Sequence, residues 1–293
     1  MMNKKVSVII PFYNGVKLLC DAVQSALDQT YNNIEIIVVN DGSKEDVSDF
    51  LDKYRDKIIY RFQQNQGSAV ARNHAMQIAT GDYFAFLDSD DIWLPSKLEK
   101  QISFMEKIGA VWSHTGFYYW YPKNDEMKIV NNHHDYGYIY KRTFVTFRLA
   151  TPCVVVSRRA LIEHPDITFP AAFRKAQDTE YFRALSKYYP VALIKEPLAK
   201  IRMRKDNSNK QAVLRFNLKA NDYIRFKNNP EVPKGAIMIY SIYYLYSKLF
   251  GKKTNNFKEK IALLFWSFPF ALERIYIRRL TQNLITDKKF IKE

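Results

Sequence analysis

Short apolar runs alternate with amphipathic segments along the first part of the chain. The runs 6–10, 34–40 and 83–87 are mostly apolar, which is typical of strands buried in a sheet. Between the first two runs, residues 18–29 place apolar side chains at helical spacing. This strand–helix–strand order predicts a βαβ unit, and therefore an α/β fold with a mostly parallel sheet and flanking helices.

Acidic residues follow two of these predicted strands. The third run ends in Asp88, Asp90 and Asp91, and the second ends in Asp41. Because the carboxyl ends of parallel strands meet at one edge of a sheet, where ligands bind, we expect Asp41 and Asp88 on the same edge. Carboxylate oxygens there suit Mg²⁺ or Mn²⁺ with a phosphorylated substrate. The alternative is a solvated acidic turn that caps the helix beginning near Pro95.

A basic residue is expected beside these acids. Gly67 begins a predicted helix that carries Arg72 in its early turns. An arginine near a helix N-terminus and next to acidic strand ends can hold a phosphate or a carboxylate. An ion pair between Arg72 and an aspartate inside the sheet edge is the alternative.

The second half of the chain predicts further strands and a helix with an acid in its first turn. Residues 111–120 are an aromatic-rich strand and 151–157 a buried strand, whereas 121–140 shows no clear period. The helix that opens within 173–182 carries Asp178 in its first turn, where the helix dipole favours an acid. That local role is the alternative to a catalytic one.

The histidines and cysteines indicate neither a metal site nor a disulfide framework. His133 and His134 are adjacent, but no third ligand stands at a metal-site spacing, so we expect a solvated loop. Cys20 and Cys153 lie in apolar surroundings and are expected to be reduced core residues of a cytosolic protein. No signal-peptide pattern opens the chain, and no apolar run reaches the roughly 20 residues of a spanning helix.

The composition indicates a globular protein with a basic, aromatic C-terminal part. The 293 residues suit one large domain or a domain with an appendage, and the net charge is +15. Residues 234–293 hold 12 lysines and arginines but 4 acids, interleaved with many aromatic residues. This composition is typical of helices that lie on an anionic membrane surface. The alternative is a helical subdomain that packs its aromatic residues on the core. The net charge also makes a basic nucleic-acid binding protein an alternative function. However, the charge is concentrated in the aromatic tail and no recognised binding motif is present, so no nucleic acid is expected as a partner.

The order of the motifs resembles glycosyltransferase family 2, the inverting family with the GT-A fold, of the bacterial surface-polysaccharide type. Five blocks carry the resemblance: Pro11-Phe12-Tyr13-Asn14, Asn40-Asp41-Gly42-Ser43, Asn65-x-Gly67 with Ala71-Arg72-Asn73, Gly81-Asp82-Tyr83 through Asp88-Ser89-Asp90-Asp91-x-Trp93, and Gln177-Asp178. The resemblance covers roughly residues 4–205. A single Asp-x-Asp is a weak signal, but five blocks in this order are a strong one.

The resemblance implies a Rossmann-like GT-A catalytic domain over 1–210, with a nucleotide-sugar half (about 1–110) and an acceptor half (about 111–210). Residues 211–293 are then a helical extension. The residues implied to bind the donor are Pro11, Tyr13, Asn14, Asp41, Asn65, Arg72, Asp88, Ser89 and Arg202. Asp90, with Asp88 as a second candidate, is implied to hold Mn²⁺ or Mg²⁺, and Asp178 is implied to be the catalytic base.

Two positions depart from the family's pattern. Gln177 replaces the acid that usually precedes the base, so a second carboxylate role is absent there. Arg202 matches an arginine of the family's late Tyr-Arg-x-His segment, but Arg204 stands where a histidine is common. Either this fixed charge contacts the diphosphate, or the segment is a basic loop.

The expected function is the transfer of a sugar, with inversion, from a nucleotide diphosphate to a glycan hydroxyl. Asp41 can accept a hydrogen bond from a nucleobase imide, which favours a UDP-sugar, and Trp93 and the tyrosines near 118–121 can stack on sugar rings. The acceptor is expected to be a lipid-linked, lipopolysaccharide or capsule glycan, and the protein to lie in the cytoplasm on the inner face of the membrane. A sugar-phosphate nucleotidyltransferase is the alternative enzyme, but 11–15 is not its glycine-rich basic loop.

Overall fold

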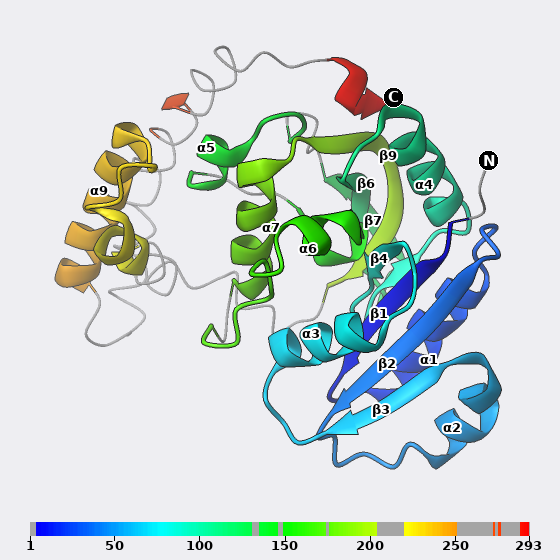
Figure 1. Cartoon of the computed structure of the whole chain (residues 1–293). Coiled ribbons are helices and arrows are strands. Elements are labelled where there is room, and N and C mark those ends of the chain that lie inside the picture. The colour runs from blue at the N-terminus through cyan, green and yellow to red at the C-terminus, as the bar shows by residue number, and fades with distance from the viewer. Residues whose placement is uncertain are drawn as a thin grey trace. The chain divides into compact units, whose positions relative to one another are not determined.

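The computed structural model describes residues 4–130, 135–145, 149–173, 176–203, 220–250, 272, 275–276 and 288–292 (Figure 1). The chain forms two compact units. The first, unit 1, comprises Met1–Tyr138, Arg148–Met203 and Thr286–Glu293, and the second, unit 2, comprises Ile139–Phe147 and Arg204–Ile285. The predicted boundary near residue 210 stays a prediction, because it lies outside the described residues.

The first half of unit 1 alternates strands and helices, as the apolar pattern predicts. Its elements are β1 (Val6–Phe12), α1 (Val16–Leu27), β2 (Ile34–Asp41), α2 (Ser48–Tyr54), the 3₁₀ turn η1 (Arg55–Lys57), β3 (Ile59–Gln63), α3 (Ser68–Ile78) and β4 (Tyr83–Phe86). β1 pairs in parallel with β2 and β4, and β2 pairs in parallel with β3. The parallel βαβ arrangement is therefore confirmed.

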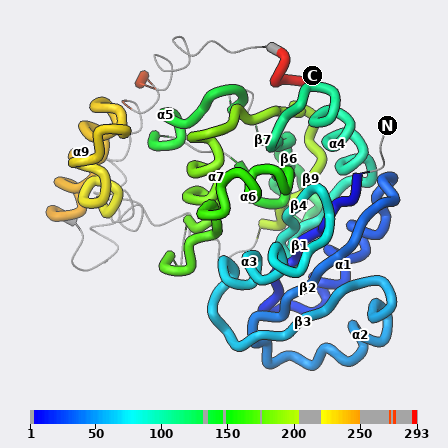
Figure 2. Tube along the Cα trace, in the orientation of Figure 1, coloured from blue at the N-terminus to red at the C-terminus, as the bar shows by residue number. Residues whose placement is uncertain are grey.

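The second half of unit 1 adds strands of very different length, some of them antiparallel to their neighbours. Its elements are β5 (Ile92–Trp93), α4 (Lys97–Ile108), β6 (Trp112–Tyr121), β7 (Glu126–Val130), the 3₁₀ turn η2 (Thr151–Cys153), β8 (Val155–Ser157), α6 (Arg159–Glu163), α7 (Gln177–Tyr188), β9 (Val191–Arg202), the 3₁₀ turn η3 (Lys288–Phe290) and β10 (Ile291–Lys292). The strand order is β10-β9-β6-β8-β4-β1-β2-β3, with β5 beside β9 and β7 beside β6. The trace in Figure 2 runs through this sheet from β3 to β9.

Two local differences from the sequence-based expectation have physical reasons. Residues 151–157 are not one strand, since a 3₁₀ turn occupies Thr151–Cys153 and the strand begins at Val155. Pro152 has no backbone N–H to give to a ladder, which suits a turn. β7 is a strand within the region whose sequence shows no clear period. It pairs with β6 but is exposed on both faces, so no alternation of apolar and polar residues marks it.

Apolar side chains fill both faces of the sheet in unit 1. On one face, Val8 and Ile10 of β1 pack in one cluster with residues of α1 and α4, including Leu19 and Met105. On the other face, the ring of Phe86 contacts the rings of three aromatic residues, which are Phe169, Tyr181 and Phe182. Figure 1 shows α6 and α7 in front of the sheet. The packed faces leave the strand ends free to carry polar residues.

The described part of unit 2 is helical. It includes α5 (Tyr140–Thr143) and α9 (Lys234–Phe250). α9 buries Ala236, Ile239, Tyr240 and Tyr243 in a cluster with residues near Phe144 and Phe226. Within the part of the chain that is described, no helix combines the length and the apolar character needed to cross a bilayer.

Candidate active site

The parallel strands β1, β2 and β4 bring the first, second and fourth predicted blocks to one edge of the sheet. In the register, Phe12 lies beside Asn40, and Ile9 lies beside Phe86. The residues just beyond these pairs therefore share the carboxyl edge. Tyr13 is 51% exposed there. Asn14 is also exposed, whereas Pro11 is buried and offers only its backbone.

Asp41 is buried at this edge and holds the loop before α3. Its Oδ1 accepts hydrogen bonds from Gln63 Nε2 at 2.8 Å and Gln66 N at 2.9 Å, and its Oδ2 accepts one from Gly67 N at 2.8 Å. The side chain of Asn65 donates to the backbone oxygen of Asp41 at 3.0 Å. A carboxylate has about four acceptor positions, so three bonds leave room for one more donor.

Arg72 and Asp88 form the ion pair that the sequence left as an alternative. Arg72 Nη2 lies 2.5 Å from Asp88 Oδ1, and the arginine is buried. The guanidinium carbon lies 5.3 Å from the centre of the Phe169 ring. Within the described residues, Arg72 Nε has no hydrogen-bond partner. α3 is thus tied directly to the acidic segment after β4, and the donor-binding role of Arg72 stays a prediction.

Three acids crowd together after β4. Asp91 is buried, and its Oδ1 accepts a hydrogen bond from the backbone N–H of Arg202 at 2.7 Å. Burial raises the pKa of Asp91 well above its usual range, and the charges of Asp88 and Asp90 raise it further. Ser89 lies between these acids and is partly buried. The nearby charge of Arg202 acts in the opposite direction and lowers this pKa.

The carboxylates fit a cation that is shared with a substrate. In the described part of the chain, no three His, Cys, Asp or Glu side chains form a metal cage. Mg²⁺, however, is commonly bound through one or two carboxylates together with substrate phosphates. Asp90 and Asp88 supply such hard oxygen atoms, so the residues present suit Mg²⁺ or Mn²⁺ when a phosphorylated ligand completes the shell.

Arg202, at the end of β9, fastens the acidic segment to two other elements. Its Nε donates to the backbone oxygen of Asp90 at 2.9 Å, and its Nη2 lies 3.0 Å from Asp21 Oδ2 on α1. The guanidinium also lies 4.5 Å from the ring centre of Trp120 on β6. These contacts give Arg202 a structural role at the site. Arg204, like His133 and His134, lies outside the described residues.

Asp178 belongs to the same site through α7. It is the second residue of this helix, and its Oδ1 accepts a hydrogen bond from Thr179 N at 2.8 Å. The preceding side chain, Gln177, accepts a hydrogen bond from Ser68 Oγ at 3.1 Å. Since Ser68 is the first residue of α3, the N-termini of α3 and α7 lie side by side. The donor edge and the candidate base are therefore brought together.

One candidate aromatic residue lies in the core and not in the site. Trp93 is buried, and its Nε1 donates to the backbone oxygen of Pro152 at 2.7 Å. It therefore has no face for a sugar ring. Several residues that shape the site escaped the sequence reading: Asp21, Gln63, Ser68 and Thr151. These residues carry no local signal.

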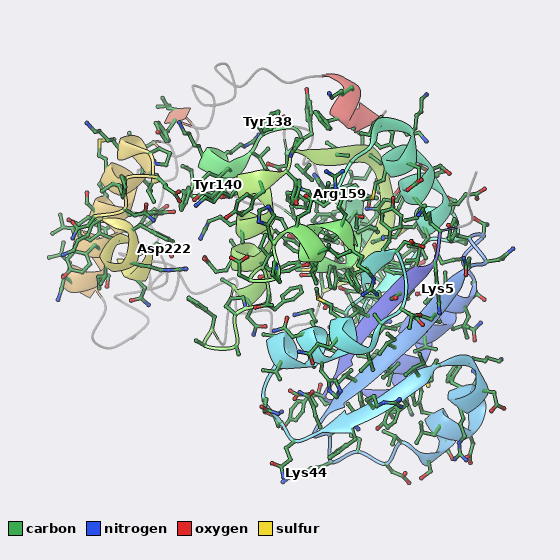
Figure 3. All side chains as sticks on the ribbon, viewed as in Figure 1. Lys5, Lys44, Tyr138, Tyr140, Arg159 and Asp222 are labelled. Atoms are coloured by element: carbon green, nitrogen blue, oxygen red, sulfur yellow. The ribbon has the colours of Figure 1, made fainter. Side chains whose placement is uncertain are left out.

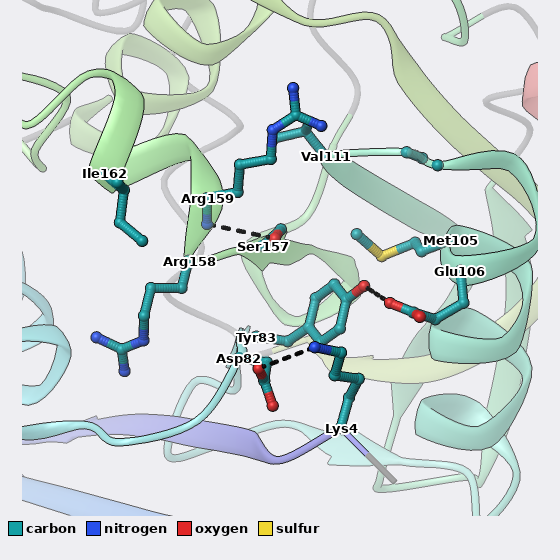
Figure 4. A pocket seen from close by; sticks show the side chains of 12 residues that line it. Lys4, Asp82, Tyr83, Met105, Glu106, Val111, Ser157, Arg158, Arg159 and Ile162 are labelled. Atoms are coloured by element: carbon teal, nitrogen blue, oxygen red, sulfur yellow. Dashed lines mark hydrogen bonds and ion pairs between the residues drawn. The ribbon is translucent and has the colours of Figure 1, made fainter. Parts of the chain in front are cut away.

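A cavity of ≈450 Å³ lies away from this site (Figure 4). It is lined by Lys4 and Asp82, which precede β1 and β4, and by Ser157 at the end of the antiparallel β8. These residues mark the amino-terminal edge of the parallel strands, opposite to Asp41 and Asp88. Lys4 and Asp82 pair with each other there at 3.3 Å.

Comparison with known proteins identifies a family. The family described as glycosyl transferase family 2 matches residues 7–165. An uncharacterized glycosyltransferase of Rickettsia bellii is 34% identical over 71% of this chain and 30% of its own length. The chain covers 30% to 33% of the length of the first three relatives. A further relative, the Escherichia coli protein named UDP-Glc:alpha-D-GlcNAc-diphosphoundecaprenol beta-1,3-glucosyltransferase WfaP, is 45% identical over 39% of this chain and 46% of its own length.

Solved structures show the same fold. S. aureus TarS 1-349 in complex with UDP-GlcNAc has a TM-score of 0.60 at 19% identity, covering 82% of this chain and 72% of the TarS 1-349 chain. The mannosyltransferase PcManGT from Pyrobaculum calidifontis, in complex with GDP-Man and Mn²⁺, has a TM-score of 0.58 at 14% identity, covering 95% of this chain and 83% of PcManGT. The fold is thus the GT-A fold.

Proposed function

Because the chain belongs to glycosyl transferase family 2, a family of transferase enzymes, we propose that it transfers a sugar from a nucleotide-diphosphate donor to a glycan hydroxyl with inversion. The observation that carries the proposal is the meeting of Asp41, the Asp88–Asp91 segment and Asp178 at one site of a GT-A fold. The predicted family, fold and enzyme class are confirmed. The donor, the acceptor and the roles of single residues are proposed.

The donor is a UDP-sugar in this proposal. Asp41 retains room for one more hydrogen bond, which matches the imide N–H of uracil, and the exposed Tyr13 lies at the same edge. The proposed uracil site is flanked by Pro11, Asn14 and Asn65. The adjoining acidic segment contains Ser89 and is hydrogen-bonded to Arg202 of β9. The structure of TarS with UDP-GlcNAc supports a uridine nucleotide in this fold.

A divalent cation, Mn²⁺ or Mg²⁺, completes the donor site. Asp90 and Asp88 would hold it, and when bound it would neutralise negative charge on the departing diphosphate. Arg72 is paired with Asp88 at 2.5 Å and so stands beside the place where that charge develops. The complex of PcManGT with Mn²⁺ supports a cation in this fold.

Asp178 is the general base. A carboxylate that accepts the proton of the acceptor hydroxyl makes its oxygen a better nucleophile. Attack from the side opposite to the leaving diphosphate inverts the anomeric centre, so a single base is sufficient. Support comes from the position of α7, whose N-terminus is joined to that of α3 by the bond between Ser68 and Gln177.

The acceptor is a lipid-linked or cell-surface glycan, such as a lipopolysaccharide or capsule chain. The name of WfaP gives it a diphosphoundecaprenol-linked acceptor, which supports a lipid-linked acceptor here. In unit 2, α9 exposes Met238, Leu245 and Leu249 on one helical face, while Lys234 and Lys248 flank it. An apolar row with lysines fits binding to an anionic membrane surface, on the inner face of the cell membrane.

A thermal-shift panel joined to a transfer assay tests this function. With Mn²⁺ present, UDP should raise the melting temperature, because a ligand that binds only the folded state stabilises it, and EDTA should abolish the shift. Asp178→Asn should keep the UDP shift and lower transfer by about 10²-fold or more. Asp49→Asn is the matched control, since Asp49 is the second residue of α2 and is exposed. If Asp178→Asn transfers as well as wild type does, the assignment of Asp178 as the base is wrong. If no nucleotide raises the melting temperature, the assignment of the donor site is wrong.

A further inference from the structure

The candidate base receives a hydrogen bond from a segment outside its own helix. Thr151 Oγ1 donates to Asp178 Oδ2 at 3.3 Å, while the other oxygen is held by the backbone of Thr179. Thr151 is buried. Among the described residues, Asp178 has no ion pair, so these two bonds are the polar contacts recorded for its carboxylate. Thr151 is therefore the one described side chain that orients it.

The turn that carries Thr151 is fixed from beneath. Trp93 Nε1 donates to the backbone oxygen of Pro152 at 2.7 Å, and Gln101 Nε2 donates to that of Cys153 at 3.0 Å. Gln101 also donates to Ser113 Oγ on β6 at 2.9 Å. Trp93 and Gln101 are both buried. Two consecutive carbonyl groups of η2 are thus anchored to β5 and α4, which leaves Thr151 little freedom to move.

A buried lysine contacts both Trp93 and Gln101, the two side chains that hold η2. Lys97 is fully buried, and its Nζ donates to Gln101 Oε1 at 2.9 Å and lies 4.2 Å from the ring centre of Trp93. Burial lowers the pKa of this ammonium to about 7. A buried amine is costly unless it is well placed, and here it fixes the orientations of both side chains that hold η2.

Trp93, which holds η2, closely follows the acidic segment Asp88–Asp91 in the chain. Trp93 follows Asp91 by two residues, and its backbone N–H donates to Ser25 Oγ at 3.2 Å. Residues 88–93 therefore run from the proposed cation ligands to the indole that holds Pro152. Trp93 therefore connects the segment of the proposed cation ligands to the turn whose Thr151 contacts the candidate base Asp178.

We propose that Thr151 is a positioning residue for the general base: its hydroxyl fixes the orientation of the Asp178 carboxylate. A hydrogen bond donated to one oxygen of a carboxylate limits the rotation of the group. The 3.3 Å separation is longer than usual for two oxygen atoms, and such bonds commonly shorten when substrate binds. This inference rests on the proposed function, in which Asp178 is the base.

The test compares Thr151→Val, which removes the hydroxyl, with Thr151→Ser, which keeps it. Thr151→Val should lower kcat by about tenfold, or about 1.4 kcal/mol of barrier. Thr151→Ser should retain the wild-type kcat, because it keeps the hydroxyl that orients the carboxylate. The KM for the donor and the thermal shift with UDP and Mn²⁺ should not change.

Thr30→Val is the matched control. Thr30 Oγ1 donates to Glu99 Oε2 at 2.5 Å on the surface, so this variant also removes a bond between threonine and a carboxylate, and it should keep the wild-type kcat. If Thr151→Val fails to fold, Thr151→Ala takes its place. A folded hydroxyl-free variant with the wild-type kcat overturns the inference, and so does equal impairment in Thr151→Ser.

The two proposals fail separately. If Asp178→Asn retains transfer, the proposed base is wrong and this inference is overturned with it. If Asp178→Asn abolishes transfer while Thr151→Val keeps the wild-type kcat, the base stands and only the role of Thr151 is overturned.

Discussion

Single carboxylates in this molecule hold backbone segments while they face the candidate site. Asp41 takes the N–H groups of Gln66 and Gly67, and Asp91 takes that of Arg202. Buried backbone donors need such partners, because an unpaired one costs about 1–3 kcal/mol. The acids are therefore as much part of the loop structure as of the chemistry, and substitutions at these positions test both.

Asp41→Asn should destabilise the protein as well as weaken donor binding. The amide of asparagine has one oxygen, so the Asp41 position can no longer accept from both the Gln66 and Gly67 N–H groups through separate oxygen atoms. We expect the free energy of unfolding to fall by about 1–3 kcal/mol, measured in urea, and the UDP thermal shift to shrink.

Asp46→Asn is the control for that substitution. Asp46 is exposed and accepts hydrogen bonds from the backbone and side chain of Ser48. Its replacement should change the free energy of unfolding by no more than about 0.5 kcal/mol. Equal stability of Asp41→Asn and wild type would show that the loop does not depend on the carboxylate.

The sequence reveals those site residues that stand at the ends of strands. Asp41 and Asp88 could be placed together because parallel strands end at a common edge, which is a property of the fold and not of distance along the chain. Thr151 and Asp21 could not be placed at the site in this way. Thr151 contacts Asp178 from a different element, 27 residues away, and Asp21 contacts Arg202 across 181 residues. Nothing in the local pattern marks such partners.

At the scale of elements, the amino-terminal edge of the sheet depends on one acid. Glu35 at the start of β2 accepts from Ser7 Oγ at 2.5 Å, from Thr80 N at 2.6 Å and from Lys5 Nζ at 2.8 Å. Lys5 is labelled beside β1 in Figure 3. Burial works to raise the pKa of Glu35, but the hydrogen bonds from Lys5, Ser7 and Thr80 outweigh it and lower the pKa to about 2.

Glu35→Gln should therefore change how stability depends on pH. The folded state holds Glu35 ionised, so its contribution is present above the unfolded pKa and is lost as pH falls through the folded pKa of about 2. Wild type should exceed the variant in free energy of unfolding at pH 7, and this difference should shrink between about pH 5 and pH 2. Urea unfolding across this range measures it, and a constant difference would contradict the assignment.

At the scale of the whole molecule, α9 presents apolar residues on two opposite faces. Ala236, Ile239 and Tyr243 are buried in unit 2, while Leu245 and Leu249 are exposed. The apolar composition of this segment predicts a helix, which α9 confirms over Lys234–Phe250. Residues 261–272 are also rich in apolar side chains, but they lie almost wholly outside the described residues. Membrane binding by the C-terminal part therefore stays a proposal.

Leu245→Asp should weaken binding to vesicles that contain anionic lipid. A charge on the exposed apolar face opposes its insertion among the lipid headgroups. Ile162→Asp, at an exposed position of α6 in unit 1, is the control and should bind as wild type does. Co-sedimentation with vesicles measures both variants, and equal binding by both would argue against α9 as the contact.

The last described strand has a consequence for how the protein is made. β10 pairs with β9, at Ile291 with Leu193, although all of Arg204–Ile285 lies between them in the chain. In the order of the chain, unit 2 therefore lies between two paired strands of unit 1 and is not a tail that can be trimmed. On the ribosome, β9 can pair with β6 on one edge, but the edge that β10 covers stays open until unit 2 has been synthesised. A chain that stops early keeps an open strand edge, which invites pairing with other chains.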